Sequence, residues 1–123
     1  MLNLLLDEHI SPDVAMGLRR RVRLLAIRSM QEWEHGNFLG QDDDACLKAA
    51  ASQKLTLVTY DRRTIPLLLK TWAEQDRHHG GVIFVDEKTI SPADVGGLVR
   101  ALATLARQAR QWNWTDRICF LSR

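Results

Sequence analysis

Short apolar runs alternate with longer amphipathic stretches along this chain, and several of the runs end at an acidic residue. The run at 55–60, Leu-Thr-Leu-Val-Thr-Tyr, is rich in β-branched residues and stops at Asp61, so it predicts a buried strand. The run at 2–6 is nearly all apolar and stops at Asp7, which predicts a strand covered on both faces and central in its sheet. Further strands are predicted at 23–27, 82–85 and 117–121.

Helices are predicted in the intervals between these runs. Ser11 and Pro12 are typical of a helix cap and a first helical residue, and the apolar spacing after them predicts a helix over 12–21. The same Ser-Pro pair at 91–92 predicts the start of a helix that runs to about residue 112. The stretch 29–41 has no sustained period and predicts a loop with room for a helical turn. Two more helices are predicted over 45–53, which follows three aspartates, and over 65–76.

This order of elements predicts an α/β fold. Short strands separated by helices favour a mostly parallel sheet of about five strands with helices on both faces, a three-layer αβα arrangement. A chain of 123 residues suits a single domain over 1–123 that buries a core without disulfides or a structural metal. Its 46% hydrophobic and 26% charged residues are typical of globular proteins and argue against extensive disorder.

Composition narrows the setting in which the protein is expected to act. The net charge is only +2, so affinity for nucleic acid must come from local arginine patches such as 19–23, which equally suit a solvated helix end. The two cysteines lack the spacing of a zinc site or a redox pair, which favours reduced thiols. No apolar run approaches the roughly 20 residues that cross a bilayer, and the start of the chain is not typical of a signal peptide. We therefore expect a cytoplasmic protein with no membrane span.

Acidic residues follow three of the predicted strands, at Asp7, Asp61 and Asp86. Asp43 or Asp44 begins a helix that is expected to start on the same edge, where the carboxyl ends of parallel strands bind ligands. Carboxylates gathered in this way repel one another unless a cation joins them, which favours Mg²⁺ or Mn²⁺. Such an ion activates water and stabilises phosphoryl oxygens. The alternative is that each aspartate only caps a helix or ends a strand, which is the commoner role of a single one.

Histidine and tryptophan offer weaker candidates. The four histidines match no zinc spacing, and the pair at 78–79 predicts a solvated loop. Trp72 and Trp112 lie on helical apolar stripes and are predicted to be core, whereas Trp33 and Trp114 equally suit a subunit or partner surface. The chain contains no glycine-rich phosphate loop and no nucleophile elbow.

Four stretches together resemble one known family: 4–12 (Leu-Leu-Leu-Asp-Glu-His-Ile-Ser-Pro), Asp43 ahead of an alanine-bearing helix, 57–62 (Leu-Val-Thr-Tyr-Asp-Arg) and 81–85 (Gly-Val-Ile-Phe-Val). With these, the chain resembles the PIN-like family, in the compact branch related to VapC-type toxin nucleases. The likeness covers almost the whole chain. It implies a Rossmann-like PIN fold, a divalent-metal site, RNA as substrate, a small antitoxin protein as a frequent partner, and a homodimer.

The resemblance also assigns residues by position. Asp7 matches the family's acid after the first strand, Asp61 the acid after the third, and Asp43 the helix-opening acid, with Asp44 as its rival. These matches imply that Asp7, Asp43 and Asp61 bind the metal and carry catalysis. Further acids that could contribute are Glu8, Asp44 and Asp86.

Two arginines follow Asp61, and they suit phosphate binding but differ from the family's pattern. Arg62 or Arg63 would steady the substrate phosphate. Arg63, however, stands where many relatives have a second aspartate, and His9 stands where asparagine is common. The sequence therefore predicts a metal-dependent endoribonuclease, or else a domain that binds RNA or a protein partner without cleavage. A phosphoacceptor domain with Asp61 as the modified residue is a third, weaker hypothesis.

Overall fold

The computed structural model describes residues 2–122, with Met1 and Arg123 outside the described part. Its strands are β1 (Asn3–Leu6), β2 (Ala26–Ser29), β3 (Thr56–Thr59), β4 (Val82–Phe84) and β5 (Ile118–Phe120). They form one five-stranded sheet in the order β2-β1-β3-β4-β5, and every neighbouring pair is parallel. The predicted parallel sheet is therefore confirmed, with β1 inside it as its apolar sequence indicated.

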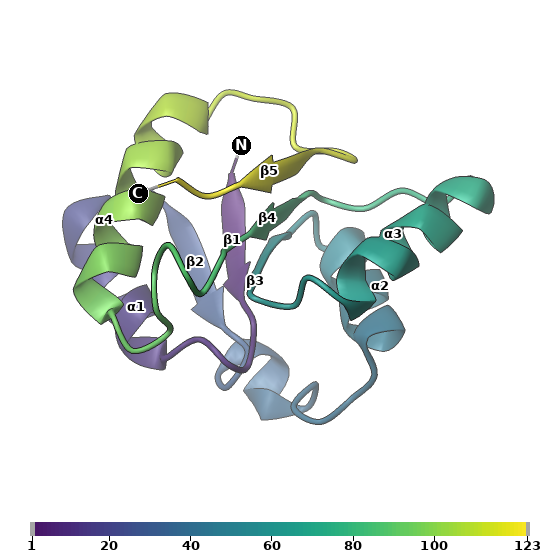
Figure 1. Ribbon diagram of the computed structural model, residues 1–123, viewed down its shortest axis with the longest axis horizontal. Coiled ribbons are helices and arrows are strands. Elements are labelled where there is room, and N and C mark those ends of the chain that lie inside the picture. The colour runs from purple at the N-terminus through teal and green to yellow at the C-terminus, as the bar shows by residue number, and fades with distance from the viewer. Residues whose placement is uncertain (1, 123) are drawn as a thin grey trace.

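Helices cover both faces of this sheet (Figure 1). They are α1 (Pro12–Arg21), α2 (Asp43–Ser52), α3 (Thr64–Glu74) and α4 (Val95–Ala109), and a 3₁₀ turn, η1 (Trp33–Gly36), lies in the predicted loop. Helices α1 and α4 pack together on one face, whereas α2 and α3 lie on the other. The result is the expected three-layer, Rossmann-like αβα fold.

Alternation of side chains across the strands explains why the central runs are mostly apolar. On β1, Leu4 and Leu6 pack under α1 and α4, while Leu5 points to the opposite core under α2 and α3. On β3, Val58 and Leu57 divide between the same two cores. Each face therefore requires a helical layer, and a polar residue inside these strands would be buried.

Two helix starts follow the local sequence closely. The Ser11 side chain accepts a hydrogen bond from the backbone N–H of Asp13, and Pro12 is the first residue of α1. At α2 the Asp42 side chain accepts from the N–H of Ala45, so Asp43 occupies the first turn. Acids at this end complement the helix dipole.

Two predicted boundaries are wrong. The strand predicted at 23–27 begins only at Ala26, because the segment before it turns out of α1 and leaves the Leu24 side chain 85% exposed. The helix predicted from the Ser-Pro pair at 91–92 begins at Val95 and ends at Ala109. The Ser91 hydroxyl accepts from the N–H two residues later and closes a local turn. The side chain of Asp94 caps the helix instead.

The strand order decides where ligands can approach. From β1 the chain moves outward to β2, then crosses back to β3 and continues to β4 and β5. The direction therefore reverses between β1 and β3, and in open parallel sheets the crevice at such a reversal is the usual ligand site. Asp7 and Asp61 follow these two strands. No helix within residues 2–122 is long and apolar enough to cross a membrane.

Candidate acidic site

A buried hydroxyl connects the two acids at the reversal point. Thr59 ends β3 and is 0% exposed, and its Oγ1 donates to Asp7 Oδ2 at 2.6 Å. The same oxygen accepts a hydrogen bond from the backbone N–H of Asp61 at 3.0 Å. Asp7 itself is anchored by its N–H, which donates to the carbonyl of Val58, and its Oδ1 accepts from the N–H of Glu8 at 2.7 Å. The Asp7 carboxylate therefore has a defined orientation.

Asp61 does act as a local helix cap, but with only one of its oxygens. Its Oδ1 accepts from the backbone N–H groups of Arg63 and Thr64, at 2.9 and 2.8 Å, where α3 begins. Within the described residues, Oδ2 accepts no hydrogen bond from the protein. This oxygen is available to a ligand, so the capping role and a ligand-binding role are compatible.

Asp43 lies within the electrostatic field of these acids. Burial raises the pKa of its carboxyl, and the negative charges of Asp61, Asp7 and Glu8 raise it further. In the described part of the chain, neither Asp43, Asp7 nor Asp61 forms an ion pair with a basic side chain. Acids from three distant segments therefore meet at one edge without an internal counter-charge.

A small hollow lies among these residues. Asp7, Glu8 and Asp43 line it together with Cys46, and its volume is about 10 Å³, space for about one water molecule. Burial, followed by the charge of Asp43, raises the pKa of the Cys46 thiol to about 11. Cys46 is therefore a neutral thiol at physiological pH and supplies neither a thiolate ligand nor a nucleophile.

The donor set determines which ion would suit this edge. Within residues 2–122 no three His, Cys, Asp or Glu side chains are positioned to hold one ion together. Mg²⁺ keeps several waters and is usually bound through one or two carboxylates plus substrate phosphates, so it needs no such enclosure. The donors at this edge are carboxylate oxygens, which suit a hydrated hard cation held through one or two of them and do not suit a thiolate- or imidazole-bound metal.

Asp44, the rival of Asp43, has a different role. Its carboxylate accepts from the indole N–H of Trp72 at 2.7 Å and pairs with Arg77 at 3.4 Å. The Arg77 guanidinium in turn lies 4.0 Å from the centre of the Trp72 ring. These contacts tie α2 to α3. Only Asp43 of the two is left to face Asp7 and Asp61.

Asp86, the third strand-end acid, is paired rather than open. Its Oδ2 lies 3.1 Å from Nη1 of Arg62, and the Arg62 guanidinium is 5.7 Å from the Phe120 ring centre. Arg63 is exposed at the start of α3, and no acid or hydrogen-bond acceptor in the described chain contacts its guanidinium. Both arginines line a hollow of about 320 Å³ that also contains Asp61. Cationic groups therefore stand next to the acidic site.

The pair at 78–79 is only half solvated, so that prediction is wrong for His79. His79 is 7% exposed; its Nδ1 accepts from the N–H of Gly81, and burial lowers its pKa. His78 is exposed and contacts Asp116 at 2.6 Å, which raises the pKa of His78. Neither histidine lines the hollow formed by Asp7, Glu8 and Asp43.

One tryptophan departs from its predicted position, and the two whose position the sequence left open are buried. Trp112 was predicted to be core but is 39% exposed, because α4 ends before it. Trp33 and Trp114, suggested for a partner surface, are buried at 0% and 5%, since their segments fold back onto the two cores. Trp72 is buried as predicted. The rings of Trp33, Trp72 and Trp114 are therefore buried and do not form part of the protein surface.

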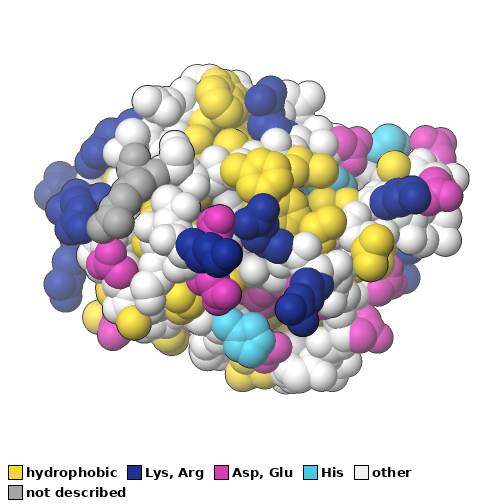
Figure 2. All heavy atoms as spheres, viewed as in Figure 1, with side chains coloured by type: hydrophobic (Ala, Val, Ile, Leu, Met, Phe, Trp, Pro, Cys, Tyr) yellow, Lys and Arg dark blue, Asp and Glu magenta, His cyan; other side chains and the backbone are white. Residues whose placement is uncertain are grey.

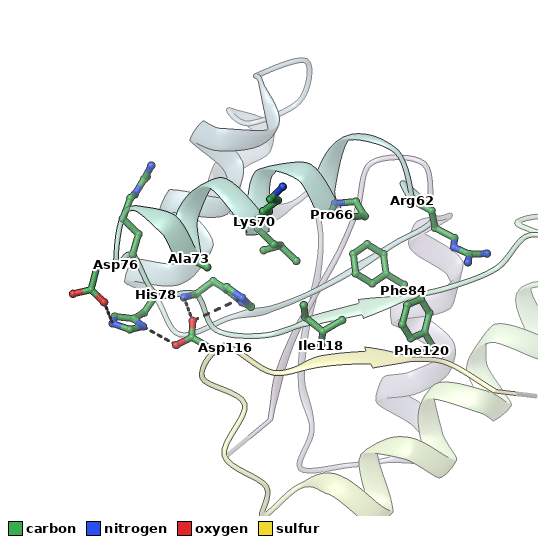
Figure 3. A pocket seen from close by; sticks show the side chains of 13 residues that line it. Arg62, Pro66, Lys70, Ala73, Asp76, His78, Phe84, Asp116, Ile118 and Phe120 are labelled. Carbon is green, nitrogen blue, oxygen red and sulfur yellow. Dashed lines mark hydrogen bonds and ion pairs between the residues drawn. The ribbon is translucent and has the colours of Figure 1, made fainter.

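A larger groove, which the sequence did not indicate, opens between α3 and β5 (Figure 3). Its volume is about 680 Å³, and Phe84, Ile118 and Phe120 form its apolar side. Because α3 does not extend over the edge strand, Ile118 and Phe120 are 50% and 63% exposed. Figure 2 shows hydrophobic side chains gathered on this face, with Lys and Arg side chains at their border and acidic side chains close by.

The fold and this edge define a three-layer α/β domain with an acidic crevice at the carboxyl ends of β1 and β3. No protein-family model, no curated protein and no solved structure matches the chain. The resemblance to the PIN-like family therefore stays a prediction, and conclusions about function depend on the geometry of the site.

Proposed function

We propose that this protein is a metal-dependent endoribonuclease that hydrolyses RNA phosphodiesters with Mg²⁺ or Mn²⁺ at Asp7, Asp43 and Asp61. One observation carries the proposal: carboxylates from three distant segments share one edge of the sheet, with no basic partner in the described chain. Gathering like charges costs free energy, which a bound divalent cation would offset. A purely structural role would not require this gathering.

The chain's own residues have distinct roles in this proposal. A bound ion would supply Lewis acidity and activate water. Asp7, oriented by Thr59, and the free oxygen of Asp61 would hold it. Asp43, whose pKa is raised, is the carboxylate best suited to accept a proton from the attacking water.

The two arginines differ in how readily they can bind the substrate phosphate. Arg63 has no acidic partner in the described chain and can engage a phosphate directly. Arg62 must exchange its contact with Asp86 for the phosphate. Arg63 is therefore the first phosphate ligand in this proposal.

The choice of RNA, and of a small antitoxin and a second copy of the chain as partners, is supported by the PIN-like resemblance. So is a cytoplasmic location. These parts of the proposal depend on the family assignment, whereas the acidic site does not.

A second candidate function is RNA binding without cleavage. Two observations favour it: both oxygens of Asp7 already accept hydrogen bonds, and Arg63 occupies the place of an expected carboxylate. Binding would then depend on the arginines and weaken as salt screens phosphate contacts.

A cleavage assay separates the two candidates. Purified protein is incubated with end-labelled single-stranded RNA in Mg²⁺, in Mn²⁺ and in EDTA, alongside Asp7→Asn and Asp61→Asn. The matched control is Asp86→Asn, a strand-end acid paired with Arg62. The nuclease predicts cleavage in either metal, reduced at least about 100-fold in the two site variants but not in the control. RNA that is bound equally by all four proteins and cut by none would establish the second candidate instead.

A further inference from the structure

The groove between α3 and β5 lies beside the acidic site and shares a wall with it. Arg62 lines both this groove and the 320 Å³ hollow that contains Asp61. Figure 3 places Arg62 at one end of the groove, next to Phe84 and Phe120, and the charged group around Asp116 at the other. A ligand chain leaving the acidic site past Arg62 would enter the groove at its aromatic end.

Strand register puts the aromatic residues in line with the acids. Thr59, Phe84 and Phe120 are partners on the neighbouring strands β3, β4 and β5. Thr59 contacts Asp7 on the other side, so the row crosses the sheet from the acid to the exposed ring. With neighbouring strands about 4.8 Å apart, Thr59 and Phe120 are separated by about 10 Å. All of these side chains face the α2 and α3 side.

Phe120 is an exposed aromatic ring that packs against the buried ring of Phe84. Its ring stacks on Phe84 with centroids 5.6 Å apart, and Phe84 is 2% exposed. Phe120 itself is 63% exposed, although the register places it on a face that helices cover elsewhere. A fixed ring with an accessible surface is the arrangement on which unpaired bases stack.

The charges at the two ends of the groove are unlike. The aromatic end carries Arg62, and Lys70 on α3 lines the same groove. The far end carries Asp76 and Asp116 together with Arg77 and His78, but Arg77 is paired with Asp44 and His78 with Asp116. A ligand with a flat apolar part and one anionic group would therefore place the anion near Lys70 and Arg62, toward the acidic site, with Arg62 exchanging its contact with Asp86 for the anion.

We infer that the groove between α3 and β5 binds an unpaired nucleotide of the RNA strand, with its base on Phe120 and its phosphate at Arg62. This inference rests on the proposed function for the choice of substrate, because that substrate passes the acidic site next to Arg62. The volume of this groove, about 680 Å³, lies within the range of ligand pockets. The cationic end and its continuity with the acidic site favour a nucleotide over an apolar protein segment.

The test uses the full chain and an RNA of defined form. A fluorescein-labelled single-stranded RNA of about 12 nucleotides, within the range bound by proteins with such exposed rings, is titrated in EDTA so that binding is measured without cleavage. The variants are Phe120→Ala, Phe120→Leu and Phe120→Trp, and the control is Leu67→Ala. Leu67 is 68% exposed on α3 and does not line the groove. Thermal unfolding checks that every variant is folded.

Loss of the ring should weaken binding about tenfold in both Phe120→Ala and Phe120→Leu, as expected for one base stack. Phe120→Trp and Leu67→Ala should bind as the wild type does, and the same RNA annealed to its complement should bind more weakly. Leucine separates stacking from simple apolar contact. Wild-type affinity in Phe120→Leu would overturn the inference, as would wild-type affinity in Phe120→Ala. A change in sedimenting mass in Phe120→Ala with unchanged RNA affinity would identify the groove as a protein interface and overturn it too.

Cleavage in Mg²⁺, measured separately, distinguishes the two proposals. If RNA binding depends on Phe120 but no metal cleaves the RNA, the groove is upheld and the nuclease is rejected. If cleavage depends on Asp7 but the Phe120 variants retain full affinity and rate, the nuclease is upheld and the groove is rejected.

Discussion

Replacement of Thr59 by valine tests whether one buried hydroxyl organises the acidic site. The substitution keeps the β-branched shape inside β3 and removes only the hydrogen-bonding group. The change breaks the 2.6 Å bond to Asp7 and leaves the N–H of Asp61 without its acceptor.

The expected loss of stability can be estimated from these contacts. A hydrogen bond to a charged group contributes about 1.5–3 kcal/mol. The added methyl group at a fully buried position returns about 0.8 kcal/mol of hydrophobic burial. The lost bond from the N–H of Asp61 adds about 0.5–1.5 kcal/mol. We therefore expect Thr59→Val to lower the free energy of unfolding by about 1–4 kcal/mol. For a chain of this length, that corresponds to a fall of about 4–15 °C in the unfolding midpoint.

The same change should reduce activity, because it frees the Asp7 carboxylate to rotate. Loss of a group that orients a metal ligand typically costs 10–100-fold in metal affinity or activity, so we expect RNA cleavage to fall at least about tenfold. Urea unfolding and initial cleavage rates in Mg²⁺ are measured on the same preparations.

Two control variants separate the role of the hydroxyl from general effects of the substitution. Thr56→Val removes an equally buried hydroxyl from β3, but that group donates to the carbonyl of Gly80 at the opposite end of the strand. The Thr56→Val variant should therefore lose stability but keep its cleavage activity. Thr59→Ser keeps the hydroxyl and should retain most activity. Full cleavage by Thr59→Val, with a stability loss no greater than that of Thr59→Ser, would refute the reasoning.

Three further predictions concern stability. Burial and neighbouring acids raise the folded-state pKa of Asp43, so its ionised form destabilises the fold and stability is lost as pH rises through that range. Asp43→Asn should therefore raise the midpoint of urea unfolding at neutral pH, and Mg²⁺ should stabilise the wild type more than the variant. The contact with Asp116 raises the pKa of His78 from its ordinary 6.5. Burial is the largest single effect on the Asp116 carboxyl and raises its pKa, but the hydrogen bonds and charges of His79 and His78 together outweigh burial and lower that pKa from 3.8. Asp116→Asn should therefore lower the unfolding midpoint most at about pH 5.5 and progressively less as His78 deprotonates above it. Gly81→Ala should cost at least about 2 kcal/mol in urea unfolding, since φ is +102° and the new Cβ would lie 2.7 Å from the carbonyl oxygen of Trp114.

Each of these predictions has a matched control. Asp13 is an acid in the first turn of α1 but is not among the acids that raise the pKa of Asp43, so Asp13→Asn should not stabilise the protein. Gly40 also has a positive φ of +75°, but a Cβ there meets nothing within 4 Å, so Gly40→Ala should cost only about 1 kcal/mol. An Asp116→Asn effect that is the same at pH about 5.5 and 8.5 would show that the charge of His78 is not involved.

Local chemistry was sufficient for most of the secondary structure. The nearly all-apolar run of β1 predicted a central strand because both of its faces must be covered. Ser11 and Pro12 predicted the start of α1 because the hydrogen bond of the cap forms within one turn. The start of α4 was missed because Ser91 and Asp94 are both good capping residues. Packing of the helix onto the sheet selected the second.

The candidate site shows the same division. The sequence by itself determined that acids follow the strands, because a charged residue directly after an apolar run marks the end of a buried strand. It did not determine that Asp44 would contact Trp72 and Arg77, or that Asp86 would form an ion pair with Arg62. Neighbouring residues on a helix point in different directions, so only the placement of α2 against α3 leaves Asp43 facing the other acids.

Tertiary structure alone decided the strand order and, with it, the surroundings of each strand end. The order β2-β1-β3-β4-β5 puts Asp7 beside Asp61 and leaves β5 at an edge that α3 does not cover. In the sequence, the run at 117–121 that contains Phe120 has the same pattern as a buried strand. Burial depends on which elements pack above a residue, and that is set by contacts between segments far apart in the chain, which short-range patterns do not encode.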